Sequence, residues 1–149
     1  MNIKRIREET RKIALNLSKR KREVLAVGLF GSLARGNYNE RSDIDIFIIT
    51  NHELTLKEQD ELYYSFSALI PEFGRDITVL VYDRESLKAV PSWQTLNLIH
   101  DACFVYDPED IKGVFKMILE KAEQSGIIYE TRERVFKSTK PGRAIFSLK

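Results

Sequence analysis

Two aspartates lie inside the most apolar stretch of this sequence, and this pairing constrains the chain more than any other feature. Residues 43–49 read Asp-Ile-Asp-Ile-Phe-Ile-Ile, an alternation that is typical of a β-strand. Because successive strand side chains point to opposite faces, Asp43, Asp45 and Phe47 share one face and three isoleucines form the other. The two carboxylates are about 6.6 Å apart along the strand and repel each other. A carboxylate among apolar neighbours is costly to bury, so the pattern indicates a site rather than only a core strand.

A third carboxylate, Asp76, stands at the start of the next apolar segment, Arg75–Tyr82, which is predicted to be a strand. If this strand pairs beside the first, all three carboxylates can converge on one point. Three converging anions need a cation, and ligation by oxygen alone suits Mg²⁺ or Mn²⁺. The structural alternatives are that Asp43 ends a turn after Ser42 and that Asp76 pairs with Arg75 or with another arginine.

A second motif lies upstream, where Gly31-Ser32 follows the apolar strand predicted at Val24–Phe30 and opens a short helix. Glycine allows a phosphate to approach the backbone closely, and backbone N–H groups with a serine hydroxyl suit an anion at a helix start. Arg35, one turn further on, could add a charge-assisted contact. The alternative is an ordinary strand-to-helix turn in which the serine caps the helix.

Taken together, these residues resemble the signature of the DNA polymerase β-type nucleotidyltransferase superfamily. The signature consists of Gly31-Ser32, ten intervening residues, Asp43-Ile44-Asp45 and a carboxylate on a later strand. The resemblance covers roughly residues 24–82. It implies a palm-like fold, and the short length is similar to the minimal nucleotidyltransferases, many of which act beside a small helical HEPN-type partner as the antitoxin of a toxin–antitoxin pair.

The resemblance also implies roles for the residues. Asp43 and Asp45 would bind metal, with two Mg²⁺ ions expected and Mn²⁺ as the alternative, and Asp76 would complete the metal site and orient the acceptor hydroxyl. Gly31 and Ser32 would hold the phosphates of a nucleoside triphosphate. The implied reaction transfers a nucleoside monophosphate from a nucleoside triphosphate, with ATP as the default donor, to a hydroxyl of a protein, RNA or small molecule and releases pyrophosphate. The alternative function is a catalytically silent, antitoxin-like module that binds nucleotide and docks on a partner protein.

The remaining periodicity predicts the α/β (α+β) class, a small mixed sheet with helices packed on it. An amphipathic helix begins near Ile3, and a last helix runs from Asp107 to about Ala122. Between them a helix runs over Thr55–Leu69, with Thr55 as its N-cap and Glu58 three residues on as in a capping box, until Pro71 and Gly74 stop it. We expect one nucleotidyltransferase domain over residues 1–122. Residues 123–149 form a tail in which Ile127–Tyr129 and Val135–Lys137 could pair as a hairpin, with a turn at Pro141-Gly142.

Charge and composition limit which partners, metal sites and cellular compartment we expect for the protein. There are 24 Lys and Arg residues against 22 Asp and Glu, and nine of the basic residues lie within residues 1–22. Basic ends could meet nucleic acid, although a solvated helix face is the favoured interpretation. One cysteine and two histidines leave no internal disulfide and no structural zinc site. The sequence shows no apolar run long enough to span a membrane and no signal peptide, so we expect a cytoplasmic protein.

Overall fold

A four-stranded mixed sheet organises the computed structural model, which describes residues 2–89 and 92–138. The strand order is β3-β2-β1-β4, where the strands are β1 (Val24–Phe30), β2 (Ile44–Thr50), β3 (Ile77–Asp83) and β4 (Cys103–Tyr106). β2 runs parallel to β3, and β1 is antiparallel to both β2 and β4. The predicted small mixed sheet with packed helices is therefore confirmed.

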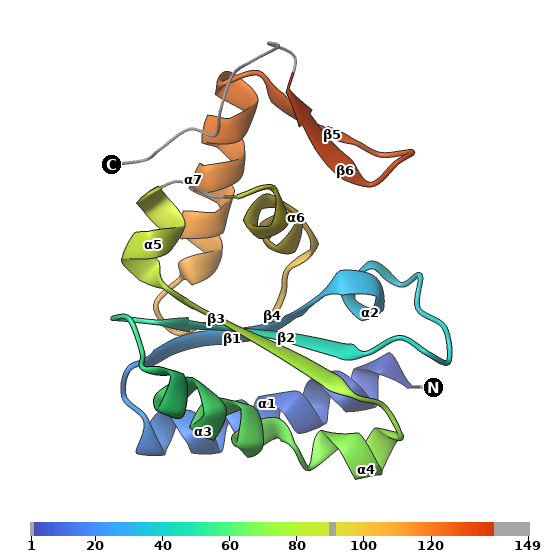
Figure 1. Ribbon diagram of the computed structural model, residues 1–149, viewed down its shortest axis with the longest axis vertical. Coiled ribbons are helices and arrows are strands. Elements are labelled where there is room, and N and C mark those ends of the chain that lie inside the picture. The colour runs from blue at the N-terminus through green and yellow to red at the C-terminus, as the bar shows by residue number, and fades with distance from the viewer. Residues whose placement is uncertain (1, 90–91, 139–149) are drawn as a thin grey trace.

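Three helices cover one face of this sheet, below it in Figure 1: α1 (Ile3–Arg20), α3 (Leu56–Phe66) and α4 (Leu69–Phe73). The isoleucines of β2 that point to this face, Ile44, Ile46 and Ile48, are fully buried in a core that also includes Leu17 and Leu62. The alternation of the sequence thus assigns these residues to the face that the structure buries.

The opposite face carries α5 (Arg84–Ala89), α6 (Trp93–Asp101) and α7 (Ile111–Gln124), above the sheet in Figure 1. Phe47 and Ile49 of β2 are buried there together with apolar residues of all three helices. The short helix α2 (Gly31–Arg35) lies at one end of this face, directly after β1. The hairpin of β5 (Ile127–Glu130) and β6 (Val135–Ser138) extends from α7 above α2 (Figure 1).

The helix predicted over Thr55–Leu69 starts as expected but ends earlier. Thr55 and Glu58 form the predicted capping box, with Thr55 Oγ1 accepting from the Glu58 amide at 3.1 Å and Glu58 Oε1 accepting from the Thr55 amide at 3.0 Å. The helix then breaks at residues 67–68, and α4 follows as a separate short helix that contains Pro71. Proline is tolerated in the first turn of a helix, so Pro71 does not stop the chain there, whereas Gly74 does end α4 in a left-handed conformation.

Three further boundaries differ from the predicted ones. β2 begins at Ile44 rather than at Asp43, and β3 begins at Ile77, so that Asp76 precedes the strand. The last helix, α7, begins at Ile111 because Asp110 caps it and the Asp107 carboxylate accepts from the Ile111 amide at 2.7 Å. Because β2 and β3 begin one residue after Asp43 and Asp76, these two metal-site candidates lie in the segments that lead into the sheet.

The β5–β6 hairpin coincides with the two strands predicted in the tail, and its residue Ile127 is buried against α6 and α7. The division of the chain into residues 1–122 and 123–149 stays a prediction, and the turn expected at Pro141-Gly142 lies outside the described residues. Within the part of the chain that the structure describes, no helix combines the length and the apolar character that crossing a membrane requires.

Candidate functional site

Asp43 and Asp45 lie where β2 begins, and Asp45 belongs to the face of β2 that carries Phe47 and packs against α6 and α7. Asp43 is exposed just before the strand, and Asp45 is half-buried opposite Phe30 of β1 on one side and Thr78 of β3 on the other. The pairing extends one residue beyond the strand, because the Ile44 amide donates to the Asp76 carbonyl at 2.9 Å. Asp45 is therefore held within the sheet, and Asp43 directly precedes the hydrogen-bonded residue Ile44.

The surroundings of Asp45 disfavour its charged form. Burial raises the pKa of the Asp45 carboxyl, a hydrogen bond from the Thr78 side chain lowers this pKa, the charge of Asp43 raises it, and Arg35 lowers it. The net result is a pKa above the ordinary value for aspartate. Carboxyl groups whose pKa is raised by burial and a like charge are found preferentially at functional sites, so Asp45 is a functional-site candidate.

Gly31 lies directly against the Asp45 carboxylate. The backbone of Gly31 is left-handed, with φ of 72°, and a Cβ atom placed there would overlap the Asp45 carboxylate oxygen. Only glycine fits both the conformation and the space. The structure therefore joins the Gly31-Ser32 turn and the Asp-Ile-Asp strand in one place, as the sequence spacing requires, with Ser32 in the first turn of α2.

Arg35 has a carboxylate partner in the structure. Its Nη1 donates to Oδ2 of Asp101 at 2.7 Å, and Asp101, at the end of α6, has a side chain only 7% exposed. The other oxygen of Asp101 lies 3.3 Å from Nδ1 of His100. Arg35 thus lies close enough for its charge to act on Asp45, but its orientation is fixed by an ion pair with α6.

Asp76, the third predicted ligand, is exposed and stands one position before β3, beside Asp43 in the parallel register. The guanidinium of Arg75 does not pair with it; Nη1 of Arg75 donates to the carbonyls of Asn39 and Ser42, at 2.7 Å each, and so anchors the loop that leads into β2. Over residues 2–89 and 92–138, no group of three or more Asp, Glu, His or Cys side chains is close enough to hold a metal ion. The assignment of Asp76 to a metal site stays a prediction.

Two residues of this site were not anticipated from the sequence. Thr78 contacts Asp45 because the parallel register of β2 and β3 places the two residues side by side. The sequence signal for Thr78 is its position two residues after Asp76, on the same face of the predicted strand. Asp101 reaches Arg35 from 66 residues away, a contact that no local pattern predicts.

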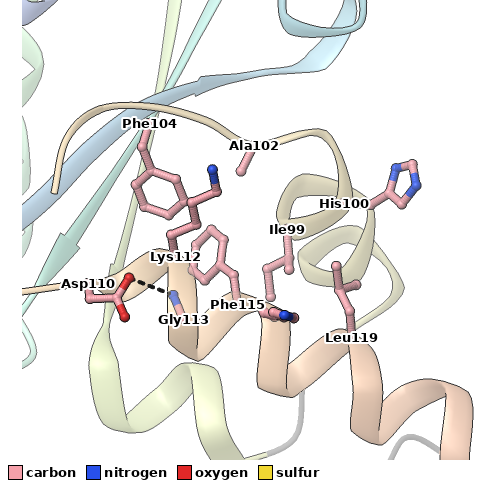
Figure 2. A pocket seen from close by; sticks show the side chains of 10 residues that line it. Ile99, His100, Ala102, Phe104, Asp110, Lys112, Gly113, Phe115 and Leu119 are labelled. Atoms are coloured by element: carbon pink, nitrogen blue, oxygen red, sulfur yellow. Dashed lines mark hydrogen bonds between the residues drawn. The ribbon is translucent and has the colours of Figure 1, made fainter.

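A cavity of about 480 Å³ lies elsewhere, between α6, β4 and α7, and is shown in Figure 2. Ile99, Phe104, Phe115 and Leu119 give it apolar walls, and Asp110 accepts from the Gly113 amide at its edge. Asp43, Asp45 and Asp76 do not line this cavity. The cavity is therefore distinct from the carboxylate site.

Comparison with known proteins identifies the family of this arrangement. The family model described as polymerase beta, nucleotidyltransferase, matches residues 11–93, which is more than half of the chain and includes every predicted site residue. A candidate protein adenylyltransferase of Methanocaldococcus jannaschii is 36% identical over 56 residues, which cover 38% of this chain. The chain spans 57% of the length of that relative.

Solved structures share the fold. A toxin–antitoxin complex with AMP-PNP contains a chain with a TM-score of 0.54 and 17% identity, over 76% of this chain and 86% of that one. The toxin–antitoxin pair MntA–HepT contains another, with a TM-score of 0.50 and 15% identity, over 78% of this chain and 86% of that one. These likenesses, together with the family match, confirm the fold and the resemblance that the motifs indicated.

Proposed function

We propose that this chain, which belongs to the polymerase beta nucleotidyltransferase family, transfers AMP from ATP to a hydroxyl group of a protein and releases pyrophosphate. The observation that carries the proposal is the contact between the half-buried Asp45 and the left-handed Gly31 at the strand-to-helix turn. AMP and a protein acceptor are favoured over other nucleotides, RNA or a small molecule by the name of the Methanocaldococcus jannaschii relative.

Asp43 and Asp45 fit a magnesium site. They offer only oxygen atoms, they lie two residues apart where β2 begins, and their mutual repulsion is one of the causes that raise the pKa of Asp45. A divalent cation relieves such repulsion, and oxygen ligands suit Mg²⁺, with Mn²⁺ as the alternative. A bound magnesium ion, or two, would supply positive charge that offsets the charge of the phosphates.

The other residues complete the proposed site. Gly31 and Ser32 would hold the phosphates near Asp45, and Asp76 would orient the acceptor hydroxyl and accept its proton. The hydroxyl oxygen forms a bond to the α-phosphorus, the bond between that phosphorus and the bridging oxygen to the β-phosphate breaks, and pyrophosphate leaves with the electron pair. Positioning and electrostatic stabilisation account for most of the catalysis in this scheme.

The proposed partner is a small helical protein of the HEPN type, which would be the acceptor or a stable complex partner. This proposal is supported by the fold shared with chains of toxin–antitoxin complexes, one of them with AMP-PNP. In such a pair, this chain would act as the antitoxin.

A silent nucleotide-binding module is the second candidate, and one observation favours it. Thr78, not a carboxylate, occupies the position beside Asp45 on β3, and Asp76 lies two residues earlier, beside Asp43. If Asp76 took no part, a site with two carboxylates could bind Mg²⁺ and nucleotide without turnover.

A label-transfer assay separates the two candidates. The protein is incubated with each α-³²P-labelled nucleoside triphosphate, Mg²⁺ and either cell extract or a co-expressed partner, beside an Asp43→Ala/Asp45→Ala double variant. The transferase predicts a labelled protein band with ATP that the double variant does not form. Measurable binding of Mg²⁺ and ATP without any labelled product would instead establish the silent module.

A further inference from the structure

A second hollow lies beside the carboxylate site, between α2, α6 and the β5–β6 hairpin. It has a volume of about 360 Å³, and its wall includes Arg35, His100, Asp101, Tyr129, Thr131 and Arg134. α2 and the hairpin lie on the same side of the molecule in Figure 1, with α6 beside them. Arg35 therefore links this hollow to Asp45, on whose carboxyl its charge acts.

The charges around the hollow do not cancel. Asp101 is neutralised by its ion pair with Arg35, whose Nη1 is 2.7 Å from the carboxylate. Arg134, on the hairpin, has no carboxylate within salt-bridge distance among residues 2–89 and 92–138. The hollow thus carries one cation in excess, and Tyr129 and Thr131 are among the residues that line it.

The hairpin holds Arg134 in an unusual conformation. Its φ is 57°, in the left-handed region that side chains rarely adopt, and its amide donates to the Glu130 carbonyl at 2.7 Å. Such a conformation costs of the order of 1 kcal/mol, is common at the end of a hairpin loop, and fixes the backbone from which the Arg134 side chain extends. The hairpin is also fixed to α6, because the Tyr129 ring stacks on His100 with ring centroids 3.6 Å apart.

We propose that this hollow binds the outer phosphates of the donor nucleotide, with Arg134 as the residue that contacts them. The inference rests on the proposed function, in which the triphosphate lies at Asp45 and Gly31. A guanidinium suits a phosphate because it can donate two parallel hydrogen bonds to it. The C-terminal hairpin would then be part of the nucleotide site rather than an accessory tail.

The test measures binding of inorganic tripolyphosphate, ATP and AMP, each with Mg²⁺, by isothermal titration calorimetry. Arg134→Met removes the cation, and Arg132→Met is the matched control, because Arg132 stands in the same loop but does not line the hollow. We expect Arg134→Met to weaken tripolyphosphate and ATP about tenfold, as loss of a hydrogen bond to a charged group does, and to leave AMP unchanged. Arg132→Met should change none of the three.

A second variant guards against an effect of misfolding. Arg134→Gly also removes the cation, but glycine accepts the left-handed backbone at this position, so the melting temperature should be maintained or raised. The same tenfold loss in Arg134→Gly would support the assignment.

Three results would overturn it: no tripolyphosphate binding by the wild type, equal losses in the Arg134 and Arg132 variants, or a loss of AMP binding as large as that of ATP, which would place the nucleoside end in the hollow. Failure of the proposed function is seen separately. Absence of label transfer together with weakened tripolyphosphate binding in Arg134→Met refutes the transferase but keeps the hollow, whereas transfer by the wild type with unchanged binding in Arg134→Met does the reverse.

Discussion

The two faces of the sheet differ in how completely they are covered, and β2 contributes to both. On the face covered by α1, α3 and α4, the side chains of Ile44, Ile46 and Ile48 are fully buried. On the opposite face, Phe47 and Ile49 are buried under α6 and α7, but Asp45 is half-buried and Asp43 is exposed. One strand therefore contributes both to the core and to the candidate site, because the side chains at its start are less completely covered on this face.

The largest expected effect concerns activity at the open end. Asp45→Asn should reduce AMP transfer by at least about a hundredfold, since it removes a charge on which the proposed site depends. The same variant should unfold at a higher temperature in the absence of divalent metal, because the surroundings of Asp45 disfavour its charged form and asparagine carries no charge. Label transfer and thermal denaturation at pH 7 measure both effects.

Asparagine retains the size of aspartate and can still accept the Thr78 hydrogen bond. The variant therefore tests the loss of the charge alone. Full transfer activity in Asp45→Asn would refute the assignment of this residue to the metal site. A lower melting temperature would show that Asp45 supports the fold rather than only the chemistry.

The neighbouring residue should behave in the opposite way. Ile46→Ala leaves a cavity on the fully covered face and should lower the free energy of unfolding by about 2–5 kcal/mol. Urea denaturation monitored by circular dichroism measures this loss. If Ile46→Ala were no less stable than Asp45→Asn, the contrast between a closed and an open face would be wrong.

Two glycines, both in left-handed conformations, sharpen the comparison at the turn. Gly31→Ala should destabilise the fold by about 1–3 kcal/mol and abolish most transfer, because its Cβ would displace the Asp45 carboxylate. Gly36→Ala carries the same kind of backbone cost, with φ of 85°, but a Cβ there meets nothing within 4 Å. It should therefore cost about 1 kcal/mol and leave transfer nearly intact.

Chemical denaturation and the label-transfer assay applied to both variants separate backbone strain from displacement of Asp45. Equal loss of transfer in the two variants would mean that the conformation of α2 matters and that the contact between Gly31 and Asp45 does not.

Much of this arrangement follows from the sequence, and what does not follow has a physical reason. The alternation of residues 43–49 predicts which side chains of β2 are buried, and Thr55 with Glu58 predicts the start of α3, because both signals are local. The break between α3 and α4 at residues 67–68 is not predicted, because no glycine or proline marks it and it depends on how the two helices pack. The Thr78 and Asp101 contacts depend on strand register and on a distant helix, so the motif predicts the candidate site but not the residues that surround it.

The smallest expected effect is a pH dependence that belongs to Asp45 alone. Because its pKa in the folded protein is raised above the unfolded value, the folded state binds more protons than the unfolded state between these two pKa values. The stability that protonated Asp45 contributes is therefore present at low pH and is lost as the pH rises through the folded pKa. The difference in free energy of unfolding between Asp45→Asn and the wild type, measured without divalent metal, should grow over this range and then level off.

Thr78→Val extends this prediction to the residue that the sequence did not reveal. Removing the hydroxyl takes away a hydrogen bond that lowers the pKa of Asp45, so burial would raise that pKa further and move the titration to higher pH. Urea denaturation at steps from pH 4 to pH 8, with Thr78→Val and Thr78→Val/Asp45→Asn as the matched pair, isolates the shift. The pair of wild type and Asp45→Asn is compared with this pair. If the two pairs gave the same pH dependence, Thr78 would not interact with Asp45, and the pKa of Asp45 would be set by burial, Asp43 and Arg35 alone.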